Sequence, residues 1–176
     1  RARSLTSRAP ADALRFAALA TELAHRRSEW VQAGSAYRLR GQALRVMARH
    51  EEAIQAFTAA SDCAELAGDA GFAAQVQIGS IDSMGMLGRY DEAVALARRL
   101  ERELRAVGEE IHAARALCNE GSIHFRRDRP SEALRCYESA GEILDRGEDP
   151  LISAAVRINR ANVLTQLGRL DEAMGL

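Results

Sequence analysis

The sequence contains no lysine, since all 24 of its basic residues are arginine, and these stand against 25 acidic residues. A Walker-type phosphate loop needs a lysine, so this class of nucleotide-binding site is excluded. Both signs of charge are spread over the two halves of the chain, leaving no basic arm and no acidic tail. This balance argues against nucleic acid or an anionic membrane as a partner.

Cysteine, proline and aromatic residues are also scarce. The three cysteines, Cys63, Cys118 and Cys136, form no CxxC motif, which favours reduced thiols in the cytoplasm over a disulfide framework. Only three prolines and 5% aromatic residues accompany 34 alanines, which predicts helix throughout. The longest segment without a charged residue, 70–81, is too short to cross a membrane, and the first residues do not resemble a signal peptide.

A short motif recurs at a fixed spacing of 40 residues. An acidic residue is followed by Ala13, Ala53, Ala93, Ala133 and Ala173. Such a constant spacing indicates a repeat protein, in which each unit buries its apolar face against its neighbours.

The residues between these motifs define the repeating unit. Gly88 and Gly168, with Ala48 and Asp128 at the same phase, lie where a helix must end. The acidic residues that follow favour the positive end of the next helix dipole. Each unit is therefore a helix A, a short turn and a helix B. Helices A are expected near residues 31–47, 71–87, 111–127 and 151–167, and helices B near 11–27, 51–67, 91–107 and 131–146.

These units predict an all-α fold, a right-handed α-α superhelix of antiparallel helix pairs. We expect one repeat domain over residues 1–176. It comprises an unpaired helix B at 8–28, repeats at 31–68, 71–108 and 111–147, and a truncated repeat at 151–176. The first residue is arginine and the last lies within a repeat, so we also expect a fragment of a longer protein.

The repeat resembles the tetratricopeptide repeat (TPR) family. The third unit carries its pattern of large, small, small, aromatic and small residues at Leu117, Gly121, Ala133, Tyr137 and Ala140. The unit of 40 residues is similar to the longer class of these repeats. The segment 158–169 looks most like the bacterial group associated with CHAT peptidases. One position that is usually leucine in the family holds Arg40, Ser80, Glu120 or Arg160 in this chain.

Two Glu-x-x-His pairs invite a metal-site interpretation, because this spacing supplies ligands in di-iron helix bundles. They are Glu22 with His25 and Glu109 with His112. The two pairs lie at different phases about two repeats apart, so we expect neither a metal site nor a cofactor.

A cysteine–histidine nucleophile is the second catalytic possibility. His112 and His124 each lie six residues from Cys118 and face away from it on the same helix. His124 and Cys136 can approach each other across the third helix pair. His124 shares its phase with Leu44, however, which favours a packed role, and we expect no catalytic residue.

The arginines at 98, 102 and 105 form a stripe on one helix B. A stripe of this kind could bind phosphate or an acidic partner. Glu101 precedes Arg105 by four residues, in the favourable orientation for a surface ion pair. We interpret the stripe as a solvated outer face.

The resemblance implies a ligand-binding surface on the inner faces of helices A. The residues that it places there are Arg38, Gln42, Arg45, Gln75, Asp82, Arg115, Ser122, Phe125, Arg126 and Asn162. The column of Gln42, Asp82, Ser122 and Asn162 is polar in every repeat and could bond to the backbone of an extended peptide. The arginines could hold carboxylates or phosphates. In the alternative interpretation the column is merely hydrated and the arginines pair with acids of neighbouring repeats.

The function that follows is a non-enzymatic scaffold in the bacterial cytoplasm. It would bind a peptide, acidic where the arginines make the contact, or an adjoining domain. Two alternatives stay open at this point. The chain could be the sensing arm of a larger enzyme such as a CHAT-type cysteine peptidase, or a structural array that self-associates through its truncated C-terminal end.

Overall fold

The computed structural model describes residues 10, 12, 14–22, 29–144 and 150–176. These residues form helices joined by short turns, and no strand occurs among them. Residues 14–22 are helical, and the helices that follow are α2 (Trp30–Val46), α3 (His50–Leu66), α4 (Ala70–Met86), α5 (Tyr90–Ala106), α6 (Glu110–Arg126), α7 (Pro130–Leu144), α8 (Pro150–Gln166) and α9 (Leu170–Met174). The all-α class is confirmed.

The observed helices have the predicted phase. Helices A are α2, α4, α6 and α8, and each begins and ends one residue before its predicted range. Helices B are α3, α5 and α7, which also begin one residue earlier than predicted. The helix predicted at 8–28 is described only in part, because residues 1–9, 11, 13 and 23–28 lie outside the described residues, as do 145–149.

The turns explain why the helices end where they do. Gly68, Gly88, Gly108 and Gly168 have φ between 74° and 79°, a left-handed conformation that costs glycine little. Ala48 and Asp128 adopt the same conformation with φ of 58° and 56°. The next amide then bonds to a carbonyl five residues back, as Arg49 does to Leu44 and Arg89 to Met84. The predicted helix ends are therefore confirmed, even where the residue is not glycine.

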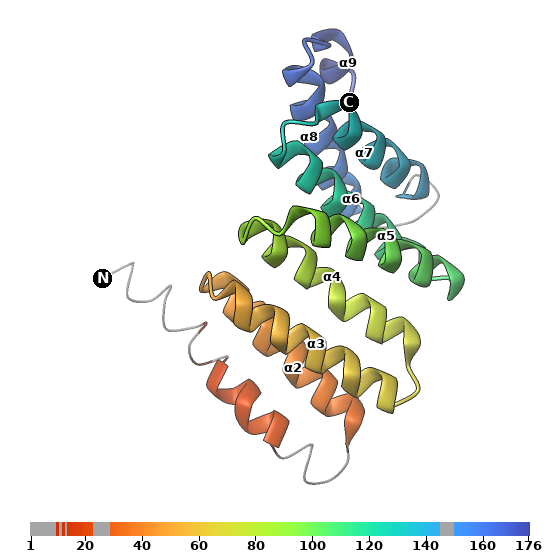
Figure 1. Ribbon diagram of the computed structural model, residues 1–176. Helices are drawn as coiled ribbons and strands as arrows, with labels where there is room; N and C mark the ends of the chain where they lie inside the picture. Colours follow the sequence, from red (N-terminus) through yellow and green to blue (C-terminus); the bar gives the residue numbers. More distant parts are fainter. Residues whose placement is uncertain (1–9, 11, 13, 23–28, 145–149) are drawn as a thin grey trace. The chain divides into compact units, whose positions relative to one another are not determined.

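The chain divides into two compact units, Arg1–Arg89 and Tyr90–Leu176. In the first unit α2 packs against α3, and α3 packs against α4 (Figure 1). The ring of Phe57 on α3 lies between two glycines, Gly41 of α2 and Gly79 of α4. A Cβ atom would lie 2.7 Å from this ring at Gly41 and 2.5 Å from it at Gly79. The ring can occupy this position only because both helices lack a side chain there.

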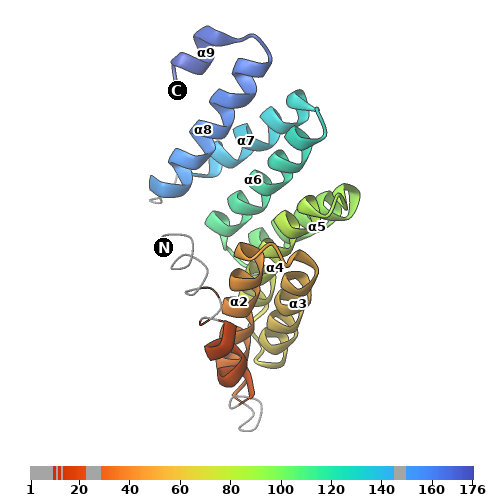
Figure 2. The same cartoon turned by 90° about the vertical axis from the view of Figure 1, so that its left-hand side faces the viewer.

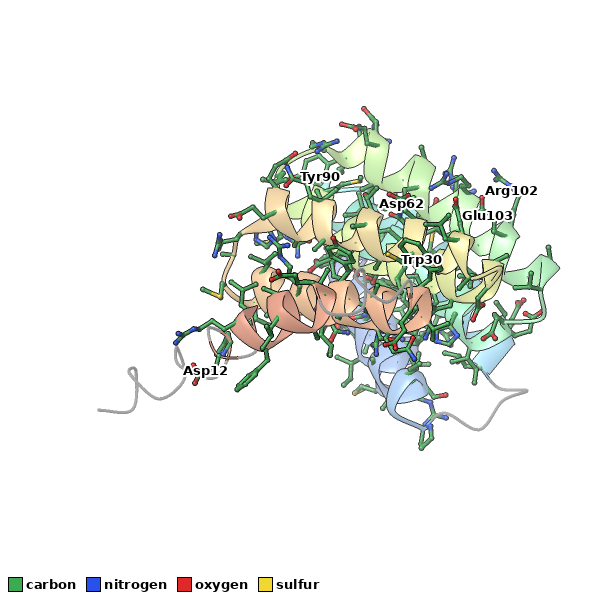
Figure 3. The ribbon with its side chains drawn as sticks, turned by 90° about the horizontal axis from the view of Figure 1, so that it is seen from below. Asp12, Trp30, Asp62, Tyr90, Arg102 and Glu103 are labelled. Carbon is green, nitrogen blue, oxygen red and sulfur yellow. The ribbon has the colours of Figure 1, made fainter. Side chains whose placement is uncertain are left out.

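A separate small cluster joins the first half of α2 to the C-terminal end of α3. Trp30 (Figure 3) and Tyr37 of α2 pack against Ala33 and against Cys63 of α3. Leu14, from the first described helix, packs against the core residues around Phe57. Residues 14–22 therefore continue the stack on the other side of α2 (Figures 1 and 2).

The second unit is built in the same way from α5 to α9. Consecutive helices pack against each other, and α6 also contacts α8 (Figure 2). Its core is a cluster of alanine, leucine and valine residues around Tyr137, with members from α6, α7 and α8. Ala93 and Ala133, whose phase predicts a close helix crossing, are completely buried.

Candidate functional site

The predicted binding residues of the first unit lie on α2 and α4. Gln42 is exposed, while Gln75 and Asp82 are half-buried. Nη1 of Arg45 lies 3.2 Å from Oδ2 of Asp82, so two of the predicted groove residues bind each other across neighbouring helices A. Arg38 is half-buried, and its Nε atom is buried without a hydrogen-bond partner. At this pair the structure agrees with the alternative in which arginines neutralise acids of the next repeat.

The predicted residues of the second unit lie on α6 and α8. Arg115, Phe125, Arg126 and Asn162 are exposed. Ser122 donates to the backbone carbonyl of Cys118 at 3.0 Å and lies 3.0 Å from the hydroxyl of Tyr137. Its side chain is therefore engaged inside the helix pair, and the polar column of the sequence analysis is not uniformly available to a ligand.

The unusual polar position of helix A faces inward. Ser80 and Glu120 are almost fully buried, and Arg40 and Arg160 are half-buried. These side chains thus belong to the interior of the helix pairs, while the exposed stripe of α2 includes Val31, Leu39 and Val46.

This exposed stripe forms one wall of a groove in the first unit. The groove has a volume of about 670 Å³ and is lined by Pro10, Phe16, Ala17 and Ala20 on one side and by Val31, Gln32, Ser35, Ala36, Leu39, Gln42, Ala43 and Val46 of α2 on the other. We call it the open groove. Phe16, Val31, Leu39 and Val46 are each more than half exposed. Four large apolar side chains that share one concave surface are typical of a docking site.

The repeat places a second copy of this surface 40 residues later. The counterparts are Ala17 and Phe57, Ala20 and Ala60, Gln32 and Phe72, Leu39 and Gly79, and Gln42 and Asp82. We call the second copy, on α3 and α4, the covered groove, because α2 lies on it. A Cβ on Gly34 of α2 would lie 3.3 Å from both the Ala60 carbonyl oxygen and the Phe72 ring. Gly41 of α2 meets Phe57, and Arg45 of α2 meets Asp82.

A second cluster of functional groups lies between α6 and α7. Glu120 and His124 are buried, Cys136 is half-buried, and their ligand atoms all lie within 4.8 Å of one another. Nε2 of His124 is 3.3 Å from Oε1 of Glu120, and the same oxygen accepts a hydrogen bond of 2.7 Å from Nε of Arg98. This contact raises the pKa of Arg98. Nδ1 of His124 is buried without a hydrogen-bond partner.

The cluster confirms that His124 is packed and that it approaches Cys136 across the helix pair. It does not provide a nucleophile in this state. Burial, followed by the nearby Glu120 carboxylate, raises the pKa of the Cys136 thiol to about 12, and burial raises the pKa of Cys118 to about 12 as well. Both thiols are therefore protonated at neutral pH, whereas a nucleophilic cysteine needs a lowered pKa.

The arginine stripe of α5 is exposed, as predicted, at all three of its positions. Arg105 forms the predicted ion pair with Glu101 at 2.7 Å, and Arg102 points outward from α5 (Figure 3). Arg98 is exposed as well, with 58% of its side chain accessible, and its Nε donates a hydrogen bond of 2.7 Å to the buried carboxylate of Glu120. Glu109 and His112, one of the two Glu-x-x-His pairs, contact each other, with Nδ1 of His112 2.9 Å from Oε2 of Glu109. His25, of the other pair, lies outside the described residues.

Sequence reasoning missed the apolar lining of the open groove. The signal was present, since Val31, Leu39 and Val46 recur at helical spacing on α2. Such a stripe is normally interpreted as core. Only the position of residues 14–22 shows that no other helix of the described ranges covers it.

No protein-family model matches the chain, and no curated protein matches it. Solved structures do match its fold. One of them is the crystal structure of BtubC (BKLC) from P. vanneervenii. The match covers 99% of this chain and 82% of BtubC, with a TM-score of 0.63 and 16% sequence identity. At this identity the likeness concerns the fold alone, and it agrees with a fold of repeated helices. None of the helices in the described ranges is both long enough and apolar enough to span a membrane.

Proposed function

We propose that the chain is a non-enzymatic protein-interaction scaffold whose open groove binds an amphipathic helix of a partner protein. The observation that carries the proposal is the pair of grooves in the first unit. The covered groove holds α2, and the open groove lies at the same repeat phases and carries exposed apolar side chains. A helix is therefore the occupant whose shape this surface fits, in a helix-in-groove mode of recognition.

The side chains of the open groove indicate the chemistry of that helix. Ala17 stands where the covered groove has Phe57, so the partner needs a bulky apolar residue where α2 has Gly41. Gln42 stands where the covered groove has Asp82. Because Gln42 is uncharged, the residue of the partner helix equivalent to Arg45 needs a hydrogen-bonding side chain and gains little from a positive charge. The ligand surface is still the exposed side of a helix A, but apolar contacts replace arginines as its main attraction.

We also infer that these repeats are of the tetratricopeptide type and that the protein acts in the bacterial cytoplasm. The pairs Gly41 with Phe57 and Gly121 with Tyr137 support the first inference, because each joins a glycine and an aromatic ring at the same two phases. The three cysteines, all free, support the second.

The proposal can be tested with a peptide made from the sequence of α2. A fluorescent peptide of residues 30–46 carrying the substitution Gly41→Leu should bind the protein saturably in an anisotropy titration. Leu39→Asp in the protein should weaken this binding about 10- to 100-fold, as expected when one leucine-sized contact is lost. Leu66→Asp is the matched control, because Leu66 is similarly exposed on α3 and does not line the groove.

Equal affinity of the Leu39→Asp and Leu66→Asp variants would contradict the proposal. Sedimentation of the protein alone at several concentrations supplies a second outcome. If a dimer forms and the peptide dissociates it, the groove binds a second copy of this chain, and the proposal of a separate partner protein fails.

A further inference from the structure

The cluster between α6 and α7 carries an inference that is independent of the open groove. We propose that Glu120, His124 and Cys136 bind a divalent transition-metal ion such as Zn²⁺, which links the two helices of this pair. A thiolate, an imidazole and a carboxylate are all established zinc ligands. The ion would complete its tetrahedron with a fourth ligand from solvent or a partner.

The geometry requires only small side-chain movements. The three ligand atoms lie within 4.8 Å of one another, and the nitrogen–oxygen separation between His124 and Glu120 is already 3.3 Å. Ligand bonds of 2.0 to 2.3 Å imply ligand–ligand separations of roughly 3.3 to 3.8 Å in a tetrahedron. Glu120 and His124 lie four residues apart on α6, so they project from the same side of that helix, and Cys136 comes from α7.

The repeat itself does not need these residue types. The counterparts of His124 are Leu44, Met84 and Leu164, and those of Cys136 include Ala56. Leu44, Leu164 and Ala56 are buried, and Met84 is half-buried. Apolar residues thus fill these positions in other helix pairs. In this pair a carboxylate and an imidazole are buried instead. Buried polar groups need partners, and a metal ion would be a partner for both the Glu120 oxygen and Nε2 of His124.

The charges balance when the ion binds. Without metal, Arg98 neutralises Glu120. On binding, the Cys136 thiol releases its proton to solvent, and one thiolate and one carboxylate then neutralise the two positive charges of the ion. Arg98 is free to return to solvent, because its side chain is 58% exposed. The half-buried Cys136 marks the side from which an ion can enter.

Cobalt is the direct probe of this site. The complete chain, stripped of metal with a chelator, should bind one Co²⁺ with a thiolate-to-cobalt charge-transfer band in the near ultraviolet, and Zn²⁺ should displace it. Mg²⁺ and Ca²⁺ should not compete, because they prefer ligand sets made of oxygen. Cys136→Ala should abolish the band and weaken cobalt binding by more than about 100-fold, the upper end of what loss of a supporting outer-shell group costs. Cys118→Ala is the matched control and should retain both properties.

His124→Leu separates metal binding from folding. Leucine occupies the equivalent buried positions at 44 and 164, so this variant should keep its helical circular dichroism. Zn²⁺ should raise the melting temperature of the wild-type protein and leave that of His124→Leu unchanged. The proposal is overturned if the wild-type chain gives no cobalt band. It is also overturned if the band survives Cys136→Ala, or if it depends on Cys118 or Cys63 instead.

Discussion

The open and covered grooves of the first unit lie at the same repeat phases and differ in most of their side chains. In the covered groove Phe57 fills the space between Gly41 and Gly79, and α2 closes the surface. In the open groove the counterparts of Phe57 and Gly79 are Ala17 and Leu39, and the apolar surface stays exposed. At these two repeat phases the large and the small side chain are therefore exchanged between the two grooves.

In the second unit Tyr137 stands at the phase of Phe57, and Asn159 stands at the phase of Gly79. Tyr137 lies against Gly121, where a Cβ would approach the ring to 2.9 Å. Its hydroxyl bonds to Ser122, and burial is the main cause that raises its pKa. The aromatic–glycine pair therefore occurs in two helix pairs of this chain, while Ala17 and Ala97 hold alanine at the aromatic phase.

The largest effect should come from removing the ring that closes the covered groove. Phe57→Ala should lower the free energy of unfolding by about 3–5 kcal/mol, because it removes a fully buried aromatic side chain and leaves a cavity. Phe16→Ala, in the open groove, should cost less than about 1 kcal/mol, since Phe16 is 72% exposed. Urea unfolding followed by circular dichroism measures both, and similar losses would contradict the contrast between the grooves.

A smaller effect should come from adding a methyl group to the covered groove. Gly79→Ala should lower the free energy of unfolding by about 1–3 kcal/mol through overpacking against Phe57. The higher helix propensity of alanine should offset roughly 1 kcal/mol of this loss. In the Phe57→Ala background the same substitution should become neutral or stabilising. A double-mutant cycle in urea checks this change of sign, and additive effects would show that the ring and the glycine are not coupled.

The smallest effect should come from the ion pair that joins α2 to the covered groove. Arg45 and Asp82 are both more than a third exposed, so Asp82→Asn should change the free energy of unfolding by less than about 1 kcal/mol. The change should shrink further at high salt. Urea midpoints at two salt concentrations measure it. A large effect that does not depend on salt would mean that Asp82 supports the fold in another way.

Local rules predicted the fold well because helix ends are fixed by nearby residues. The phases of Ala48 and Gly88 located the turns correctly, and the phase of His124 indicated its burial. The site was harder, because the availability of a polar residue depends on its neighbours in space. Asp82 is engaged by Arg45 from another repeat, and Arg98 reaches Glu120, 22 residues away in sequence. No pattern along a single helix reveals these contacts.

The account depends most on the claim that a helix docks in the open groove in the position that α2 takes on the covered one. Its direct test is the relative affinity of two peptides of residues 30–46, one with the native Gly41 and one with Gly41→Leu. The wild-type protein should prefer the leucine peptide by about tenfold or more, because Ala17 leaves room for the larger side chain. The double variant Ala17→Phe/Leu39→Gly gives these two phases the side chains of the covered groove and should reverse the preference. An unchanged ratio of affinities in the two proteins would contradict the account.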